Sequence, residues 1–349
     1  MEARGTGTQG STNPIEPNGG VRAKRILLFG ATGTIGRATL TELLSQGHHV
    51  VCFVRPQTAA NLQRVAPETV VRTGYVSNTK SIRQDAFRGD QFDAVISCLS
   101  SRTGVPDDAW KIDHQANSDI LQIAGETGKP HFILLSAICV QRPRLAFQHA
   151  KLAFEAELQA SGLPYSIIRP TAFFKSLSGQ VERVKAGKPF LIFGDGTLTS
   201  CKPISDHDVA AFIAECLENP AMKNKVLPIG GPGEAITPRA QGTYLFQSLG
   251  LEPRFRKVPV ALMDWIIRAL EFAGRFGPKY RDKAELARIG RYYATESMLV
   301  LNPKTGLYDA DATPSFGKDT LFGFYKKLAN GEETPSLGDH AVFDRKSGV

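Results

Sequence analysis

The chain has 349 residues, enough to bury a large core as one α/β unit or as two closely packed parts. Its formal net charge is +8, but the 42 Lys and Arg are scattered among 34 acidic residues, which argues against a nucleic-acid partner and favours anionic small molecules. The 5 cysteines lie far apart without a CxxC pair, which indicates a reducing compartment and no zinc or iron–sulfur cluster.

The N-terminal segment, residues 1–22, is rich in Gly, Thr, Asn and Pro, and we predict that it forms a flexible tail. No stretch of the chain approaches the roughly 20 consecutive apolar residues of a membrane span. The N-terminus also has no apolar run typical of a secretory signal. We therefore expect a cytoplasmic protein, and we leave peripheral contact with a membrane open.

Residues 23–233 alternate apolar runs with helical patterns, beginning with "KRILLFG" and "HHVVCFVR". Nearly continuous apolar strands separated by helices predict an α/β fold with a doubly wound, parallel, Rossmann-type sheet. From residue 234 prolines and aromatic residues become frequent, so residues 234–349 are predicted to form a smaller part that covers the substrate. Within it, residues 258–276 form an amphipathic helical pattern, for which burial on the sheet, a lid and shallow docking to a membrane remain alternatives.

The stretch "LLFGATGTIGRATL", residues 27–40, contains three glycines between a strand pattern and a helix pattern. This arrangement predicts a dinucleotide site, because glycine permits the tight turn, the approach of the backbone to a pyrophosphate and close helix packing. The helix N-terminus would supply N–H groups to the phosphates. The residues expected to bind the cofactor here are Gly30, Thr32, Gly33, Thr34, Ile35 and Gly36.

The second apolar strand ends at Arg55, where NAD-binding proteins often carry an acidic residue for the ribose 2′-hydroxyl. A guanidinium is suited to a 2′-phosphate, so Arg55, helped by Arg37, favours NADPH over NADH. The alternative is that both arginines are ordinary solvated surface residues. The strand "FDAVISCLSS" is expected to end beside the nicotinamide, where Ser97, Cys98 and Leu99 would line the cofactor.

The stretch "FQHAK", Phe147 to Lys151, follows a strand that ends in "LLSA". With the glycine turn, this order resembles the short-chain dehydrogenase/reductase superfamily in its extended and atypical, NmrA-like branches, where the expected pair is Tyr-x-x-x-Lys. The resemblance implies that Lys151 hydrogen-bonds the nicotinamide ribose, whereas Phe147 replaces the phenol that protonates a carbonyl oxygen. Ordinary alcohol–ketone chemistry is therefore disfavoured, and hydride delivery to a conjugated carbon–carbon double bond is favoured. The alternative for Lys151 is a solvated residue in the first turn of a helix.

The glycine turn is shared with many reductases, whereas four further stretches are specific to a narrower family. They are "FQHAKLAFEAEL", "YSIIRPTAFFKSLSGQ", "CKPISDHDVA" and "PIGGPGEAITPRAQG". From about residue 24 to about residue 330 the chain resembles the NADPH-dependent divinyl chlorophyllide a 8-vinyl-reductases. The resemblance implies reduction of the C8 vinyl group of divinyl chlorophyllide a or divinyl protochlorophyllide a to ethyl, in chlorophyll or bacteriochlorophyll biosynthesis. Because no long Ser- and Arg-rich extension precedes the strands, we expect a bacterial enzyme rather than a plastid precursor.

A planar apolar macrocycle with a propionate suggests aromatic and cationic contacts. We expect Phe147, Phe173 and Phe174 to stack on the pigment and Lys175 to meet its propionate. The proton donor is unassigned, with solvent or Lys151 acting through water as candidates. Two other functions remain open: an isoflavone-reductase-like NADPH reductase of another conjugated substrate, and a non-catalytic NADP-binding regulator or structural subunit.

Overall fold

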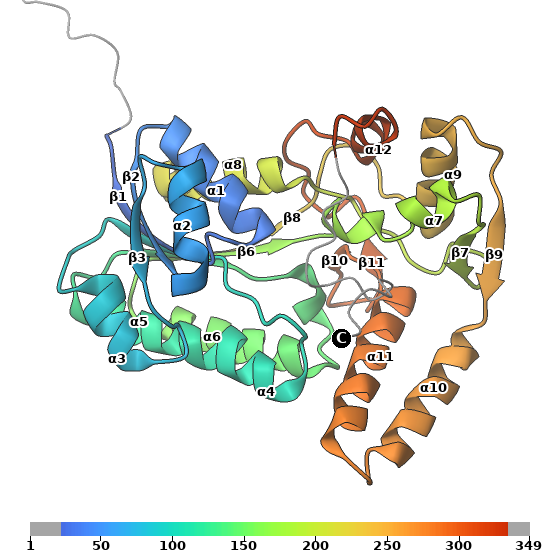
Figure 1. Cartoon of the computed structure of the whole chain (residues 1–349), viewed down its shortest axis with the longest axis horizontal. Coiled ribbons are helices and arrows are strands. Elements are labelled where there is room, and N and C mark those ends of the chain that lie inside the picture. The colour runs from blue at the N-terminus through green and yellow to red at the C-terminus, as the bar shows by residue number, and fades with distance from the viewer. Residues whose placement is uncertain (1–21, 334–349) are drawn as a thin grey trace, which may run out of the picture.

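A seven-stranded sheet forms the centre of the computed structural model, which describes residues 22–333 (Figure 1). The strand order is β3-β2-β1-β4-β5-β6-β8, and every neighbouring pair runs parallel, as the apolar runs predict. All but one residue of the predicted tail, residues 1–22, lies outside the described residues. The strands are β1 (Arg25–Phe29), β2 (His49–Val54), β3 (Val70–Thr73), β4 (Ala94–Ser97), β5 (His131–Leu135), β6 (Tyr165–Pro170) and β8 (Lys225–Ile229).

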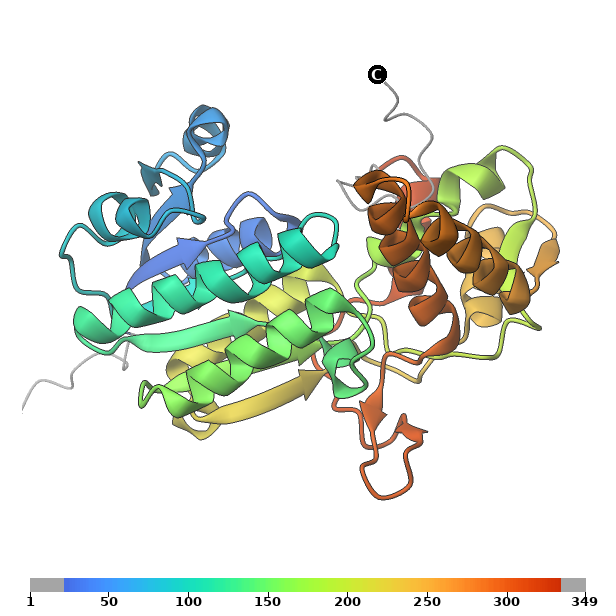
Figure 2. The same ribbon diagram turned by 90° about the horizontal axis from the view of Figure 1, so that it is seen from below.

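Helices cover both faces of this sheet (Figure 2), which explains why its central strands are apolar along their whole length. Alternate residues of β1 enter two different cores: Ile26 and Leu28 pack with α1 and α8, while Leu27 and Phe29 pack on the other face with α5 and α6. These helices are α1 (Thr34–Ser45), α5 (Asn117–Glu126), α6 (Ala146–Ala160) and α8 (Asp206–Glu218).

Shorter helical segments complete this half of the molecule. They are α2 (Pro56–Val65), α3 (Thr79–Ser81), η1 (Ile82–Phe87), α4 (Pro106–Ala109), η2 (Trp110–Ala116), η3 (Ile138–Gln141) and η5 (Pro220–Met222). A further segment, η4 (Ser176–Ser178), leaves the sheet, and its Leu177 packs in a separate core with Phe174. The segment η2 is a π-helical stretch between α4 and α5. Such stretches are rare overall, and those that occur are often found at functional sites. The side chains of η2 are therefore candidates for a functional role.

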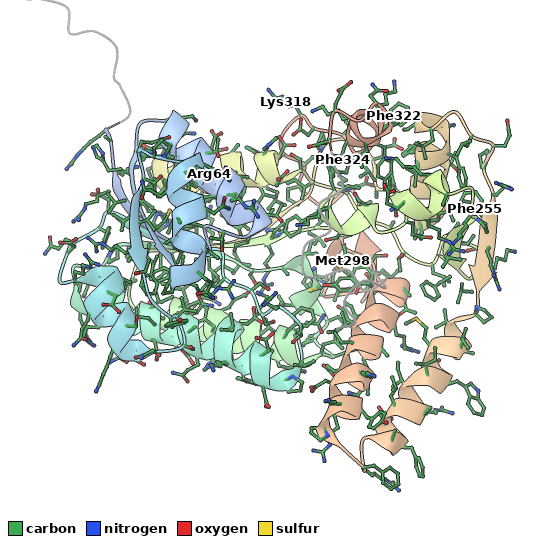
Figure 3. The ribbon with its side chains drawn as sticks, viewed as in Figure 1. Arg64, Phe255, Met298, Lys318, Phe322 and Phe324 are labelled. Atoms are coloured by element: carbon green, nitrogen blue, oxygen red, sulfur yellow. The ribbon has the colours of Figure 1, made fainter. Side chains whose placement is uncertain are left out.

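A second unit lies beside the sheet and has its own core of aromatic and aliphatic side chains, including Phe174, Phe190, Phe246 and Tyr325. Phe255, Phe322 and Phe324 also lie in this unit (Figure 3). Its elements include α7 (Val181–Lys185), β7 (Phe190–Phe193), α9 (Pro238–Ser248), β9 (Phe255–Val258) and α12 (Leu321–Ala329). The division at residue 233 stays a prediction, but β7 pairs in parallel with β9, which gives a physical reason to assign β7 to this unit.

Two long helices, α10 (Val260–Ala273) and α11 (Pro278–Thr295), pack against each other and project from the second unit (Figure 1). The end of α11 connects the two halves, because Tyr292 packs in one core cluster with Cys139 and Phe147 of the sheet unit. A two-stranded antiparallel ribbon of β10 (Val300–Leu301) and β11 (Tyr308–Asp309) follows α11.

Candidate functional site

The glycine turn after β1 has no room for side chains at two of its three glycines. Gly30 has φ +80°, and a Cβ there would lie 2.6 Å from the carbonyl oxygen of Cys98. A Cβ on Gly36 would lie 2.1 Å from the carbonyl oxygen of Gly30. Gly33 precedes α1, and no side chain caps that helix. The first N–H groups of α1 therefore face the turn and suit a phosphate, as the sequence predicts.

This turn lies at the point where the strand order reverses, with β1 between β2 and β4. In doubly wound sheets the crevice at the carboxyl ends of such strands is the usual dinucleotide site. The turn from Gly30 to Gly36 follows β1, and Ser97 and Cys98 lie at the end of β4. The structure thus brings the predicted glycine turn and the predicted nicotinamide segment to one place.

The side chains at the end of β4 point into the protein. Ser97 is fully buried, and its hydroxyl donates a hydrogen bond to Oδ1 of Asn117 at 2.6 Å. The thiol of Cys98 lies 4.0 Å from the hydroxyl of Thr39, and burial raises the pKa of this thiol to about 12. Leu99 packs on the core between the sheet and α5. Any contact of this segment with a cofactor would therefore come mainly from its backbone.

Arg55 and Arg37 flank the glycine turn on exposed positions. Arg55 directly follows β2 and precedes α2, and Nε of Arg37 donates a hydrogen bond to the carbonyl oxygen of Thr32 at 3.1 Å. Among residues 22–333 neither guanidinium forms an ion pair with an acidic side chain. Both are therefore available to an anionic ligand, and their binding of the 2′-phosphate stays a prediction.

The side chain of Lys175 extends to the glycine turn. Its ammonium donates a hydrogen bond to the hydroxyl of Thr34 at 2.7 Å, in the first turn of α1. This contact favours a role beside the phosphates over the predicted contact with a propionate. The neighbouring Arg169 forms an ion pair with buried Glu155, so it braces the end of β6.

Lys151 lies buried on α6, which excludes the alternative of a solvated surface residue. Its ammonium lies 2.9 Å from Oδ1 of Asp113, and this oxygen also accepts the N–H of Ser101 at 3.3 Å. The second oxygen of Asp113 is buried without a hydrogen-bond partner in the structure. Asp113 was missed in the sequence, because nothing in its local pattern indicates that η2 carries it to Lys151.

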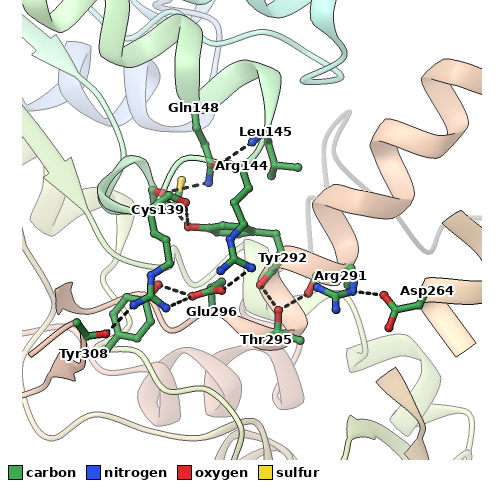
Figure 4. A network of polar contacts seen from close by, with 12 residues as sticks. Cys139, Arg144, Leu145, Gln148, Asp264, Arg291, Tyr292, Thr295, Glu296 and Tyr308 are labelled. Carbon is green, nitrogen blue, oxygen red and sulfur yellow. Dashed lines mark hydrogen bonds and ion pairs between the residues drawn. The ribbon is translucent and has the colours of Figure 1, made fainter. Parts of the chain in front are cut away.

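Phe147 lies one turn before Lys151 on α6 and packs with Tyr292 of α11. Tyr292 is no substitute for the missing phenol, because its hydroxyl donates to the carbonyl oxygens of Cys139 and Arg142 (Figure 4). Burial raises the pKa of Tyr292 to about 12. The hydroxyl of its neighbour Tyr293, a half-exposed side chain, lies 3.9 Å from the sulfur of Cys139.

The two neighbouring phenylalanines have different surroundings. Phe173 is half-buried, pairs with Ile204 through a β-bridge and packs at the edge of the core between the sheet, α1 and α8. Phe174 is buried in the core of the second unit, with its ring centroid 5.5 Å from that of Phe324. The prediction that Phe174 stacks on a pigment is therefore corrected: its ring fills a core. The ring of Phe147 is also buried, in the core cluster that contains Tyr292. Stacking of Phe147 and Phe173 on the pigment stays a proposal.

Among residues 22–333 no group of three or more His, Cys, Asp or Glu side chains is arranged to hold a metal ion. Within the same residues no helix is long and apolar enough to cross a bilayer.

Residues 30–220 match the model of an NAD(P)H-binding family. The chain is 49% identical over 332 residues to the chloroplastic divinyl chlorophyllide a 8-vinyl-reductase of Cucumis sativus, covering 91% of this chain and 79% of that protein. The enzyme of the same name from Arabidopsis thaliana is 46% identical, with 91% and 80% covered. The fold and the glycine turn define a Rossmann-type NAD(P)H-binding protein. Within that class the chain belongs to the divinyl chlorophyllide a 8-vinyl-reductase family.

Solved structures show the same fold at low sequence identity. An NADPH-dependent quinone oxidoreductase of Escherichia coli has a TM-score of 0.65 at 18% identity, with 87% of this chain and 99% of that chain covered. The leucoanthocyanidin reductase of Vitis vinifera has a TM-score of 0.64 at 14% identity, with 88% and 99% covered. At these identities the likeness concerns the fold alone.

The comparisons confirm the predicted family, fold, enzyme class and nicotinamide cofactor. The expectation of a cytoplasmic, bacterial enzyme is wrong, because the relatives at 46% to 49% identity are chloroplastic enzymes of plants. That expectation rested on the composition of residues 1–22, which is a poor indicator of compartment.

Proposed function

We propose that this chain reduces the C8 vinyl group of divinyl chlorophyllide a, or of divinyl protochlorophyllide a, to an ethyl group with NADPH as the reductant. The observation that carries the proposal is the identity of 46% to 49% to four 8-vinyl-reductases over 91% of the chain. The replacement of the expected phenol by Phe147 supports it independently, because an olefin is reduced without an acid at a carbonyl oxygen.

The glycine turn fits a dinucleotide because the space that a Cβ would fill at Gly30 and Gly36 is already occupied by backbone. We assign the pyrophosphate to the N-terminus of α1 and the 2′-phosphate to Arg55 and Arg37. When bound, NADPH supplies a hydride equivalent to the carbon–carbon double bond. Lys175 would add positive charge beside the phosphates, since its ammonium already contacts the first turn of α1.

Lys151 would orient the ribose and hold a proton near the reacting vinyl group. The carboxylate of Asp113, 2.9 Å away, keeps the ammonium in a fixed position within a buried environment. Phe147, on the same side of α6, donates no proton and presents only an apolar ring. The negative charge that develops on reduction would spread into the macrocycle, so water held by Lys151 would suffice as the proton source.

The direct test is anaerobic incubation of the purified chain with NADPH and divinyl chlorophyllide a. We expect a blue shift of the Soret band, together with oxidation of one NADPH per pigment. NADH in place of NADPH tests the cofactor preference. Binding of NADPH by calorimetry without any change of the pigment would reject the reductase proposal and favour a non-catalytic NADP-binding protein. Reduction of a phenolic enone but not the pigment would favour the isoflavone-reductase-like alternative.

A further inference from the structure

The outer face of α10 and the turn that follows it carry a stripe of exposed large apolar side chains. Positions three, four or seven residues apart lie on one side of a helix. Trp265 and Ile266 follow Leu262 by three and four residues, and Phe272 follows Trp265 by seven. The five side chains are between 45% and 78% exposed. Because α10 and α11 form a helical hairpin, we call this surface the hairpin face. It consists of Leu262, Trp265, Ile266, Phe272 and Phe276.

The opposite side of α10 packs on α11, so burial of α10 on the sheet, expected as one alternative, does not occur. Ile267 is buried at this contact. The acidic residues of α10 also face α11, where Asp264 forms an ion pair with Arg291 and Glu271 with Arg288 (Figure 4 shows the first pair). Their negative charges are thereby compensated away from the hairpin face.

The charges that border the hairpin face are mostly positive. Arg268 lies on α10 and Arg275 just beyond its end, with the guanidinium of Arg275 5.5 Å from the ring centroid of Phe272. At the turn into α11, Lys279 and Lys283 are exposed, and Nζ of Lys283 lies 6.0 Å from the ring centroid of Tyr280. Cations therefore lie beside the apolar stripe and beyond its C-terminal end, where Asp282 is the one acidic residue between Lys279 and Lys283.

We propose that the hairpin face binds the surface of a membrane that contains anionic lipids. An amphipathic helix with Trp and Phe on one face lies in the plane of the interface, with its apolar side chains about 5–10 Å deep. A helix of 14 residues is about 21 Å long and lies flat there. The Arg and Lys side chains would extend to lipid phosphates, each adding about 1 kcal/mol of attraction.

A second copy of the chain fits this face less well. A two-fold interface places the same patch on both subunits, so the cations beside each stripe would face one another. Anionic lipid instead complements both the apolar stripe and its positive border. This inference does not depend on which pigment the enzyme reduces, because it rests on surface residues remote from the glycine turn in sequence.

The test is flotation of the full chain with vesicles of phosphatidylcholine alone and vesicles with about one third phosphatidylglycerol. We expect binding to the anionic vesicles that weakens with added salt, and at least about tenfold weaker binding to neutral vesicles. The triple variant Trp265→Ser/Phe272→Ser/Phe276→Ser is expected to lose binding to both. Val65→Ser, which removes an equally exposed apolar side chain on α2, is the matched control and is expected to bind normally.

Fluorescence locates the contact, because the chain has 2 tryptophans, Trp110 and Trp265. In a Trp110→Phe variant, emission from Trp265 is expected to shift to the blue on adding anionic vesicles. No binding, or equal binding by the triple variant, would overturn the proposal. A concentration-dependent dimer that the triple substitution dissolves would assign the face to a second copy and also overturn it. Pigment reduction in detergent solution is expected to survive the triple substitution, which separates this test from that of the reductase.

Discussion

The ammonium of Lys151 lies 2.9 Å from a carboxylate oxygen of Asp113, and both side chains are buried. Removing one partner of such a pair leaves an uncompensated charge and costs about 3–5 kcal/mol. We expect Lys151→Met to lower the free energy of unfolding by about this amount. The double variant Lys151→Met/Asp113→Asn is expected to regain most of it, because no charge stays buried alone. Urea unfolding measures both.

Measurements of activity separate the catalytic role of Lys151 from the structural role of its ion pair with Asp113. Both variants are expected to lose about 100-fold in kcat, since Lys151 is absent from each. Asp113→Asn alone is expected to lower kcat with little change in the KM for NADPH, because the lysine remains but is less firmly held. A double variant as unstable as Lys151→Met alone would show that charge compensation is not what Asp113 provides.

Arg55 follows β2 at an exposed position, where its guanidinium is free to hold the 2′-phosphate. A charged bidentate contact is worth about 1.5–3 kcal/mol. We expect Arg55→Ala to raise the KM for NADPH by about tenfold or more and to change the KM for NADH little. Arg64→Ala, in the last turn of the helix α2 that follows Arg55, is the control and is expected to leave both KM values unchanged. Equal effects of Arg55→Ala on the two cofactors would reject the phosphate contact.

The turn itself is expected to tolerate alanine at one glycine and not at another. A Cβ on Gly36 would overlap the carbonyl oxygen of Gly30 at 2.1 Å, whereas a Cβ on Gly33 has its nearest atom at 3.4 Å. Gly36→Ala is therefore expected to destabilise the protein by at least about 2 kcal/mol and to abolish NADPH binding. Gly33→Ala is expected to have a free energy of unfolding close to that of the wild type. Unfolding curves that rank the variants in the opposite order would contradict this geometry.

The sequence is sufficient for the parts of the site that depend on local patterns. The apolar strands and the glycine turn follow from residue spacing, because a parallel sheet buries both faces and Gly30 needs a positive φ. Asp113 could not be found in this way, since its role depends on a π-helical segment that brings it to Lys151. Phe174 differs from Phe173 only in which core it meets, and that depends on the packing of α12.

Phe147 occupies the position where a phenol is expected in related oxidoreductases, and its ring packs with Tyr292. Phe147→Tyr restores a hydroxyl beside Lys151. We expect no gain in the rate of vinyl reduction, because the proposed reaction needs no acid at a carbonyl oxygen. Single-turnover measurements with the pigment provide the test. A clear increase in rate would show that proton transfer limits the wild-type enzyme and that its donor has been misassigned.

His131 at the start of β5 gives a prediction for stability against pH. Its ring nitrogen Nε2 lies 3.0 Å from the hydroxyl of Ser166, and burial is the main cause that lowers its pKa from 6.5 to about 4. The unfolded chain therefore binds a proton more readily than the folded chain between these values. Stability from the neutral ring is fully present above pH 6.5 and is lost as the pH falls toward 4, by up to about 3 kcal/mol. Urea unfolding at several pH values is expected to show this fall in stability, and a smaller fall in His131→Asn.

His149→Asn, at an exposed position of α6, is the control and is expected to keep the full pH dependence. Burial also lowers the pKa of His48, which explains why some dependence would remain in His131→Asn. An identical slope in wild type and His131→Asn would exclude His131 as its source.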